Sequence, residues 1–392
     1  MPSSVQELLA RERAAFDERT PASGRLYRRA AAVLAGGVSS SYHLREPWPV
    51  YLERGEGARV WDVDGNEYLD FHNGFGSMVQ GHAHPAIGRA LADRYAAGGA
   101  EVRGVDVRAD PTRAVVAGDV AEPGDWQRHA AGCDLVIHTA AIVSMRDDPG
   151  PIWRVNVLGT RRVVDAARDA GASRFVHLSS VTAFSFDFPD GVTEDYPIRA
   201  NGVPYVDTKV ASEQVVLQAH AAEELPCTVV RPGDVYGPGS RPWTILPVQE
   251  ISRRRLVLPA MGRGVLNPVY VDNLVDGIGL SATRDEGVGQ VFTISDGVGV
   301  TTREFFGHYG RLLGRKVRVA PTAVVRALAG VAARVPGEDG EVSTAAIDYI
   351  ARGGTYSIEK ARALLGYEPA VGFEEGMGRT LDWLRREGYG SA

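Results

Sequence analysis

The spacing of apolar and polar side chains divides the chain into two regions of different character. Up to about residue 97 the pattern predicts two exposed amphipathic helices, a β-hairpin and a third helix. The predicted ranges are Ser4 to Arg19 and Gly24 to Leu34 for the first two helices, Arg59 to Phe71 for a hairpin around an Asp-Gly turn, and Pro85 to about Ala97 for the third helix. From Gly98 onward, short apolar runs alternate with helical segments. This order is typical of a parallel sheet with helices on both faces.

Apolar runs in the second region predict the strands of that sheet. They are Glu101 to Asp106, Ala114 to Asp119, Asp134 to His138, Arg174 to Leu178 and Cys227 to Arg231. Helices around Trp126 to Ala131, Ile152 to Ala170 and Tyr205 to His220 fit between them. The chain continues with a helix and a loop from Arg241 to about Leu266, further helices from Thr301 onward, and an amphipathic helix from Phe373 to Arg386. The fold class is therefore α/β.

Composition narrows the functional classes. The 392 residues are enough for two domains, or for one large α/β domain with appendages. The net charge of −6 is spread without long blocks, which indicates neither a nucleic-acid nor a membrane partner. Cys133 and Cys227 lie in apolar stretches, as expected of core residues in a reducing compartment. Without a signal-like or membrane-length apolar run, the expected location is the cytoplasm, and a homodimer is left open.

One pair of residues suggests proton-transfer chemistry. Tyr205 and Lys209 are four residues apart in a helix predicted from Pro204 to about Ala222, so both side chains project from one helix face. An ammonium group beside a phenol favours the phenolate, which lets the pair exchange a hydroxyl proton near neutral pH. Serine hydroxyls at Ser179 and Ser180 could hold the substrate oxygen. The alternative is a chance pair on a solvated helix face, and only the flanking motifs decide against it.

The N-terminal region resembles a different protein family from the rest of the chain. Residues from about Leu26 to Ala97 contain GARVWDVDGNEYLDF and GFGSMVQGHAHPAI, and they resemble the start of class III pyridoxal-phosphate aminotransferases, most closely the glutamate-1-semialdehyde aminomutase branch. In that family the Schiff-base lysine comes much further along the chain. Because the resemblance stops near Ala97, we do not expect this fragment to transaminate. His82 and His84 lack a third ligand, so no metal site is predicted.

Residues 98 to 390 resemble the extended short-chain dehydrogenase/reductase family. The motifs that carry the resemblance occur in the family's order and are DLVIHTAA from Asp134, NVLGT from Asn156, LSS from Leu178, Tyr205-x-x-x-Lys209, RPGDVYGPG from Arg231 and YVDN from Tyr270. The resemblance implies a Rossmann-like doubly wound sheet with a smaller C-terminal substrate lobe, after a grafted N-terminal helix and hairpin segment. The implied domains are 1–84, 85–240 and 241–392.

The resemblance also assigns roles to individual residues. It implies that Tyr205 is the acid/base, that Lys209 lowers its pKa and holds the nicotinamide ribose, and that Ser180 orients the substrate oxygen. Ser180 is preferred to Ser179 because it stands four residues before Phe184, where the family commonly has an aromatic residue. The cofactor is expected to be NAD, with NADP as an alternative. The residues expected near it are Gly88, Asp106, Asp119, Val120, Thr139, Ala140, Ala141, Asn156, Ser179, Lys209, Pro232 and Val235.

The phosphate-binding turn of that family is not recognisable here. The family begins with a strand and a Gly-x-x-Gly-x-x-Gly turn, whose glycines let the backbone approach a pyrophosphate. Counting back from Asp106, the third glycine falls on Gly88, but the first two positions fall on His82 and Pro85. A histidine side chain and a proline without an amide N–H compromise that cradle. Residues 78–80 would have to supply the first strand. A fusion of two parents, natural or artefactual, explains this pattern.

Asp106 and one missing arginine bear on the cofactor and the substrate. An acid at the end of the second strand bonds the adenosine ribose hydroxyls, which favours NAD over NADP, although Arg108 nearby weakens that inference. Sugar-nucleotide enzymes of the family usually carry an arginine shortly before the Val-Asp motif, where this chain has Leu266. That difference favours the 3β-hydroxysteroid dehydrogenase-like branch, which reduces aldehydes and ketones. Arg263 could substitute as an anion contact.

Four functions are consistent with these residues. The first is an NAD(P)-dependent oxidoreductase that interconverts a secondary alcohol and a carbonyl on a small molecule. The second is a sugar-nucleotide epimerase or dehydratase that uses NAD transiently. The third is a catalytically impaired fusion or a binding protein, because the phosphate cradle is damaged. A pyridoxal-phosphate aminotransferase is the fourth and the least favoured. The fold cannot choose among them.

Overall fold

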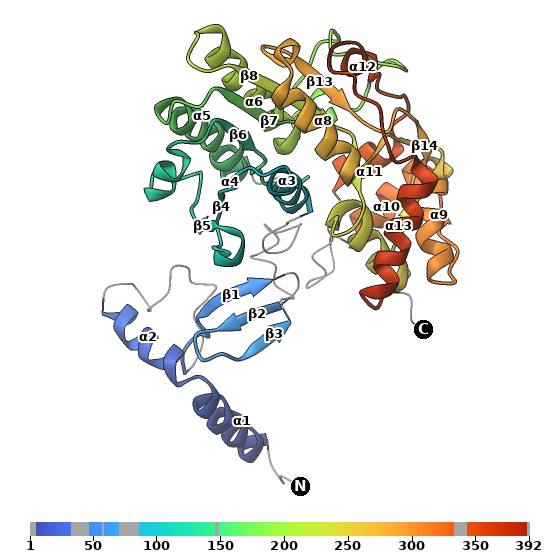
Figure 1. Cartoon of the computed structure of the whole chain (residues 1–392). Helices are drawn as coiled ribbons and strands as arrows, with labels where there is room; N and C mark the ends of the chain where they lie inside the picture. Colours follow the sequence, from blue (N-terminus) through green and yellow to red (C-terminus); the bar gives the residue numbers. More distant parts are fainter. Residues whose placement is uncertain are drawn as a thin grey trace. The chain divides into compact units, whose positions relative to one another are not determined.

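The computed structural model of the chain describes residues 5–32, 47–56, 59–69, 86–145, 149–332 and 343–389. Contacts within the chain define two compact units, Met1–Ala83 and His84–Ala392. Each unit is described by itself, and Figure 1 labels the elements of both. None of the helices in the described ranges has the length and apolar character that a membrane span requires.

The first unit contains two helices and a small antiparallel sheet of order β1-β2-β3. Its elements are α1 (Val5–Arg19), α2 (Pro21–Ala31), β1 (Leu52–Glu56), β2 (Arg59–Asp62) and β3 (Glu67–Leu69). The predicted hairpin is confirmed as β2 and β3, with Gly65 in the turn at a φ of +83° that favours glycine. Strand β1 was missed because its sequence, LERGE, has no apolar alternation.

A carboxylate in the hairpin turn caps helix α2. Asp64 accepts hydrogen bonds from the backbone N–H of Ala22 at 2.5 Å and of Ser23 at 2.9 Å. These N–H groups lie in the first turn of α2, where they have no partner within the helix. The capping acid also interacts favourably with the positive end of the helix dipole. The hairpin and the helix therefore stabilise each other.

The second unit is built on parallel strands, as predicted. Strands β6 (Leu135–His138), β7 (Arg174–Leu178), β8 (Cys227–Pro232) and β13 (Val291–Ile294) form one parallel sheet in the order β13-β8-β7-β6. Strands β4 (Gly104–Asp106) and β5 (Val115–Ala117) form a separate parallel ladder. The predicted Rossmann-like α/β fold is thus confirmed, with β4 and β5 shorter than expected.

The break between these two ladders has a simple interpretation. In a dinucleotide-binding sheet of order 3-2-1-4-5-6 the first strand lies between the second and the fourth. Strands β5 and β4 occupy the third and second positions, and β6 occupies the fourth. Within the described residues no ladder joins β4 to β6. None of the described strands takes the position of the family's first strand, and residues 78–80, expected to supply it, lie outside the described residues.

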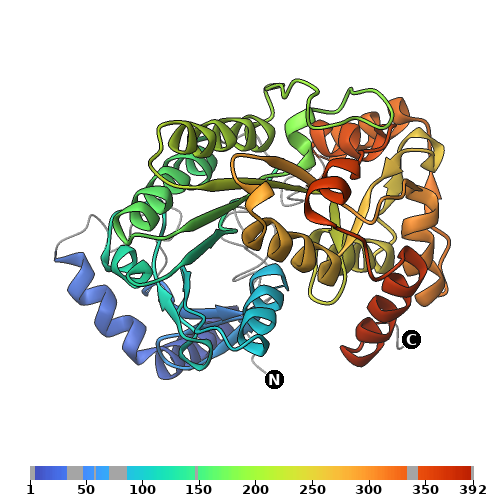
Figure 2. The ribbon, with the colours of Figure 1, turned by 45° about the horizontal axis from the view of Figure 1, so that its top comes forward.

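Helices cover both faces of the main sheet, as Figure 2 shows for α6 and α8. The helices concerned are α3 (Ala86–Ala97), α5 (Thr160–Asp169), α6 (Pro204–Ala221) and α8 (Val271–Thr283). Side chains alternate between the two faces with the period of two expected of strands. Val176, Leu178 and Val230 pack with residues of α3 and α8, whereas Phe175, Cys227 and Val229 pack with residues of α5 and α6. This double coverage explains why the strands read as uniformly apolar.

The helix predicted from Ile152 to Ala170 is not regular. It consists of α4 (Pro149–Trp153), the π-helical segment η5 (Arg154–Gly159) and α5. A β-carbon on Gly159 would lie 2.9 Å from Val120 Cγ2, so a glycine is needed where this segment packs against the loop after β5. Turns of π-helix are frequent at functional positions, and this one places Asn156 inside the protein, 1% exposed.

The C-terminal part of the second unit has a core of its own, rich in aromatic residues such as Tyr236, Phe305 and Tyr309. Its helices are η7 (Arg241–Ile245), α7 (Leu246–Ser252), α9 (Thr302–Leu312), α10 (Thr322–Ala332), α11 (Thr344–Ala351), α12 (Glu359–Leu365) and α13 (Phe373–Arg386). Its strands are β9 (Asp234–Tyr236), β10 (Val257–Leu258), β11 (Val265–Leu266), β12 (Pro268–Tyr270), β14 (Val300–Thr301) and β15 (Arg318–Val319). Short 3-10 turns are η3 (Pro111–Arg113), η4 (Asp125–Ala130), η6 (Val181–Phe184), η8 (Ala260–Gly262) and η9 (Asp285–Gly287). Here η4 replaces the helix predicted around Trp126.

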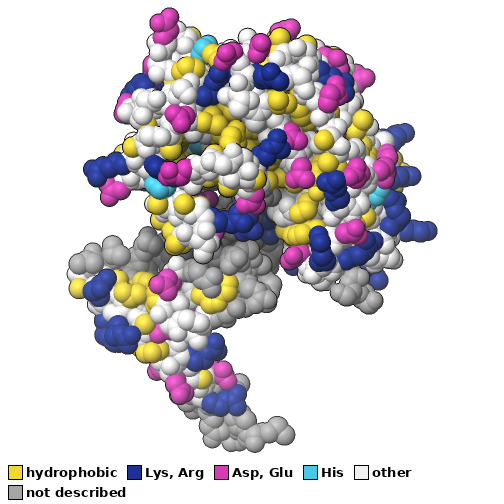
Figure 3. All heavy atoms as spheres, in the orientation of Figure 1, with side chains coloured by type: hydrophobic (Ala, Val, Ile, Leu, Met, Phe, Trp, Pro, Cys, Tyr) yellow, Lys and Arg dark blue, Asp and Glu magenta, His cyan; other side chains and the backbone are white. Residues whose placement is uncertain are grey.

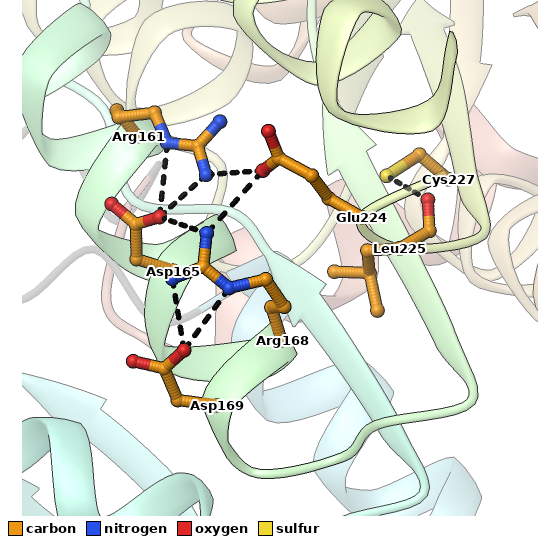
Figure 4. Close-up of polar contacts among 7 residues, drawn as sticks. All are labelled: Arg161, Asp165, Arg168, Asp169, Glu224, Leu225 and Cys227. Atoms are coloured by element: carbon orange, nitrogen blue, oxygen red, sulfur yellow. Dashed lines mark hydrogen bonds and ion pairs between the residues drawn. The ribbon is translucent and has the colours of Figure 1, made fainter. Parts of the chain in front are cut away.

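A network of ion pairs fastens α5 to the end of α6, as Figure 4 shows. Arg161 contacts Asp165 at 2.5 Å and Glu224 at 2.6 Å, and Arg168 contacts Asp165 at 3.0 Å. Close to this network the Cys227 thiol donates to the Leu225 carbonyl at 3.2 Å. Burial raises the pKa of Cys227 to about 12, so this cysteine is a core residue rather than a nucleophile.

A fully buried ion pair joins β9 to the end of α11. Asp234 accepts from Arg352 Nη2 at 2.8 Å, from the Tyr349 hydroxyl at 2.7 Å and from the Asn267 N–H at 2.8 Å. Both charged side chains are 0% exposed. Each charge therefore depends on the other, because either one alone would be buried without compensation.

Replacing Arg352→Met should lower the free energy of unfolding by about 3–5 kcal/mol, because it leaves the Asp234 carboxylate buried and unpaired. Urea unfolding followed by circular dichroism measures this change. Arg362→Met is the matched control, since Arg362 pairs with Glu359 at the surface and its loss should cost less than about 1 kcal/mol. Equal effects of the two substitutions would contradict the assignment.

Candidate active site

The Ser, Tyr and Lys side chains converge where β7 ends and α6 begins. Ser180 follows β7 and caps η6, its hydroxyl accepting from the Thr182 N–H at 3.1 Å. Proline at the first turn of α6 is preorganised for a helix, and it is followed directly by Tyr205. Parallel strands present their carboxyl ends at one edge of the sheet, which is where ligands bind in such folds.

The side chains of Ser180 and Tyr205 lie close enough for Ser180 to lower the pKa of Tyr205. Both residues are 7% exposed. Burial raises the pKa of Tyr205 to about 12, and the interaction with the Ser180 side chain opposes that shift. Desolvation of the phenolate is the largest effect on this pKa in the protein alone, and the expectation that Lys209 lowers it stays a prediction.

Lys209 follows Tyr205 by one turn of helix α6. Its Nζ donates to the Leu178 carbonyl at 2.8 Å and is 6.0 Å from the centre of the Tyr205 ring. Burial lowers the pKa of Lys209 to about 8, and the charge of Glu213 opposes this shift. An ammonium group has three donors, and Leu178 takes one of them. The others can serve hydroxyl groups of a ligand.

A second buried ion pair, which sequence reasoning missed, supports the base of this site. Glu213 is 0% exposed and accepts from Arg231 Nε at 2.9 Å, Arg231 Nη2 at 2.8 Å and the Ser179 hydroxyl at 2.5 Å. This arrangement is a bidentate pair between α6 and β8 with a serine from β7. The spacing of four residues between Lys209 and Glu213 was the available signal, because it places both on one helix face.

Two buried histidines, His138 and His177, lie near Lys209. His138 and His177 are opposite each other on β6 and β7, with ring centres 5.4 Å apart. They contact the hydroxyls of Thr160 and Ser212, both at 3.0 Å. Burial first, and then the charge of Lys209, lowers the pKa of His138 to about 3 and that of His177 well below its usual value. Both rings are therefore neutral near pH 7.

Asn156 holds the loop after β6 in place. Its side-chain oxygen accepts from the Ile142 N–H at 2.7 Å, and its nitrogen donates to the Ile142 carbonyl and to the Thr208 hydroxyl, both at 3.0 Å. The amide thus links η5, α6 and the loop that carries Thr139 to Ala141. Through these hydrogen bonds Asn156 fixes the backbone of the loop that is expected to contact the cofactor.

The other expected cofactor residues lie on successive strand ends. Val120 follows β5 and is buried, Thr139, Ala140 and Ala141 follow β6 and are half-buried, Ser179 follows β7, Pro232 ends β8 and Val235 lies in β9. Their contacts with a cofactor stay a prediction. Gly88, in the first turns of α3, has no atom within 4 Å of where a β-carbon would stand.

Two carboxylates beside β4 and β5 suit the adenosine end of a dinucleotide. Asp106 ends β4 and accepts the Arg108 N–H at 3.1 Å with one oxygen. Asp119 follows β5 and accepts the Ala121 N–H at 2.8 Å with one oxygen. Each carboxylate keeps acceptor capacity for ribose hydroxyls or an adenine amino group. These acids and Lys209 therefore fit a dinucleotide at both ends, and His82 and Pro85 of the predicted cradle lie outside the described residues.

No group of three or more His, Cys, Asp or Glu side chains in the described ranges is arranged to hold a metal ion. His82 and His84 fall outside those ranges.

Comparison with known proteins agrees with this geometry. Residues 81–295 match the NAD dependent epimerase/dehydratase family, and the chain belongs to that family. Residues 41–104 match the class III aminotransferases, which confirms the composite sequence. The epimerase/dehydratase match begins beside the position expected for the Gly-rich turn.

Individual relatives span several reactions. A ketoreductase of Stigmatella aurantiaca that acts on a farnesyl-dihydroquinoline-oxide is 33% identical over 66% of this chain and 78% of its own length. A 3-beta-hydroxysteroid dehydrogenase of Mycolicibacterium neoaurum is 28% identical over 76% of this chain and 88% of its own length. Among solved structures, MoeE5 in complex with UDP-glucose and NAD has a TM-score of 0.63 and 25% identity, covering 77% of this chain and 96% of that one.

The ionisation of Lys209 can be observed directly, because the chain has three lysines, Lys209, Lys316 and Lys360. In protein labelled with ¹⁵N-lysine, the Lys209 side-chain signal should titrate with a midpoint of about 8. Glu213→Gln should move that midpoint lower, because it removes a negative charge and leaves the Arg231 charge nearby. Glu224→Gln, a substitution in the α5 network, should leave it unchanged. A midpoint above about 10 would contradict the buried position of Lys209.

Proposed function

We propose that this protein is an NAD-dependent oxidoreductase that interconverts a secondary alcohol and a carbonyl on a small molecule. The convergence of Ser180, Tyr205 and Lys209, with Lys209 Nζ 6.0 Å from the centre of the Tyr205 ring, is the observation that carries the proposal. A substrate oxygen placed against both hydroxyls would contact a donor that orients it and a donor that transfers a proton. Membership of the NAD dependent epimerase/dehydratase family supports this reading.

In the reducing direction Tyr205 gives its proton to the substrate oxygen, and in the oxidising direction it takes that proton back. Ser180 holds the same oxygen through the transfer. Because burial keeps Tyr205 protonated near neutral pH, the site is prepared to act as an acid, which favours carbonyl reduction. The phenolate formed by proton transfer is stabilised by the ammonium of Lys209.

The nicotinamide cofactor would supply or accept the hydride. Lys209 would hold its nicotinamide ribose, and Asp106 would accept from the hydroxyls of its adenosine ribose. A 2′-phosphate beside the Asp106 carboxylate would be repelled, so we propose NAD rather than NADP. Asp119 would accept from the adenine edge.

The structure offers little for a substrate diphosphate near this site. Leu266 is 0% exposed and belongs to the aromatic-rich core. The buried arginines Arg231 and Arg352 are both bound to carboxylates, Glu213 and Asp234. The charge of each guanidinium is thus already balanced by a carboxylate, which favours a carbonyl substrate without a nucleotide. The ketoreductase among the relatives has a substrate of that kind.

A sugar-nucleotide epimerase or dehydratase is the second candidate. It is favoured by relatives such as dTDP-glucose 4,6-dehydratase of Streptomyces antibioticus, 28% identical over 70% of this chain. The same Ser, Tyr and Lys side chains would serve it, with no net consumption of NADH. An impaired fusion is a third candidate, because no ladder fills the position between β4 and β6 in the described residues.

Tyr205→Phe should lower the rate of NADH-dependent ketone reduction by about 10²–10⁴-fold, because the proton donor is lost. The rate is followed by NADH absorbance with a panel of aliphatic and aromatic ketones. For the native chain it should stay constant up to about pH 7 and fall above about pH 8, since Lys209 then loses its charge.

Tyr389→Phe, near the C-terminus, serves as the matched control and should keep the native rate. Lys209→Met should lower the rate and remove its fall at alkaline pH. Full activity of Tyr205→Phe would contradict the proposed acid, and activity without NADH consumption would favour the epimerase.

A further inference from the structure

A strongly basic groove lies on the C-terminal part of the second unit. It consists of two adjoining cavities of about 410 Å³ each, which share Arg315, Lys316 and Val317. The basic residues that line them, here called the basic groove, are Arg254, Arg303, Arg311, Arg315, Lys316 and Arg318. No acidic residue lines either cavity. Figure 3 shows Lys and Arg side chains along the edge of the molecule where α9 lies.

Among the described residues, none of these six side chains forms an ion pair. Other exposed arginines of the same unit do so, for example Arg326 with Asp348 and Arg362 with Glu359. In a chain with net charge −6, acidic partners are not scarce. Concentrated positive charge lowers stability through repulsion and attracts anions. A shortage of acidic residues in the chain therefore does not explain why these six basic side chains form no ion pairs among the described residues.

The groove is formed by defined elements. Arg303, Gly307 and Arg311 are spaced by four along α9 and share one helix face. Gly307 carries no side chain, so it leaves the space between the two arginines open. After α9 the Arg315 N–H returns to the Gly310 carbonyl at 2.8 Å. This turn leads into β15, which pairs with β10 and brings Arg318 to the same groove.

Arg254 occupies a backbone conformation that disfavours it. It follows α7 with φ of +58°, in the left-handed region. Its N–H bonds the Ile251 carbonyl at 3.0 Å, and the next N–H bonds Glu250 O at 2.8 Å, a helix ending at which glycine is usual. Residues kept in such strained conformations cluster at ligand sites. Here the strained residue is one of the cations that line the groove.

We propose that the basic groove binds a phosphorylated small molecule. The groove would hold the diphosphate of that molecule, or another of its groups with a similar density of negative charge. Guanidinium groups match phosphate oxygens in paired hydrogen bonds. The cavities have the size of small-molecule sites, and Ile251, Leu256 and Val317 supply apolar walls for the organic part of the ligand. Ser180, Tyr205 and Lys209 do not line the groove, so this site is additional to the proposed oxidoreductase site.

Calorimetric titration of the full chain with inorganic pyrophosphate tests the proposal. Binding should be saturable, and Arg315→Gln with Lys316→Gln should weaken it at least about tenfold, because two charge-assisted contacts are lost. The control variant, Arg362→Gln with Arg379→Gln, removes two exposed arginines that are ion-paired and should bind as the native chain does. Equal affinity in the groove variant and the control would overturn the proposal, because pyrophosphate would then be bound outside the groove, for example at the dinucleotide site.

The Arg254→Gly substitution provides a second measurement. A variant that merely folds poorly would lose both stability and binding, whereas this one should gain stability and lose binding. It should raise the urea midpoint, because glycine relieves the left-handed strain, and at the same time weaken pyrophosphate binding. Two further ligands distinguish the source of the anion. Vesicles containing phosphatidylglycerol or a duplex RNA that bind while pyrophosphate does not would overturn the small-molecule assignment.

Discussion

The bidentate ion pair between Glu213 and Arg231 is the interaction on which the proposed site depends. It joins α6 to β8, and through the Ser179 hydroxyl it also holds the end of β7. Lys209 and Tyr205 precede Glu213 on the same helix, so their positions follow from this anchor. A buried pair of this kind adds little net stability compared with an apolar core, but losing one partner is costly. The Glu213–Arg231 pair fixes the positions of Tyr205 and Lys209, and within the pair the two opposite charges beside Lys209 balance each other.

The described parallel strands from β4 to β8, together with β13, form two ladders. Strand β4 ends in Asp106 and strand β5 is followed by Asp119, and within the described residues no ladder links these strands to β6. Contacts such as Val105 with the core of α5 and α6 hold this ladder to the main sheet. The acid proposed to select the ribose ends β4, and the phenol proposed to transfer the proton lies on α6.

Much of this could be predicted from the sequence. Uniformly apolar strands and Pro204 located β6 to β8 and α6, because burial on both faces and helix initiation leave local signals. The partners Arg231 and Arg352 could not be assigned, since ion pairs across the fold depend on tertiary contacts. Burial of Tyr205, which raises its pKa, could not be seen in the motif because desolvation depends on the tertiary surroundings. Strand β1 carries no apolar alternation, and the π-turn at Asn156 follows from packing of Gly159 on Val120.

Calorimetric titration with NADH and NADPH tests the central claim, that the Ser180, Tyr205 and Lys209 site serves a nicotinamide dinucleotide. The titration compares the native chain with one in which residues 77–88 are replaced by a strand and Gly-rich turn of the family type. We predict that NADH binds more tightly than NADPH and that the replacement increases the affinity. No binding of either dinucleotide to either chain would contradict the account.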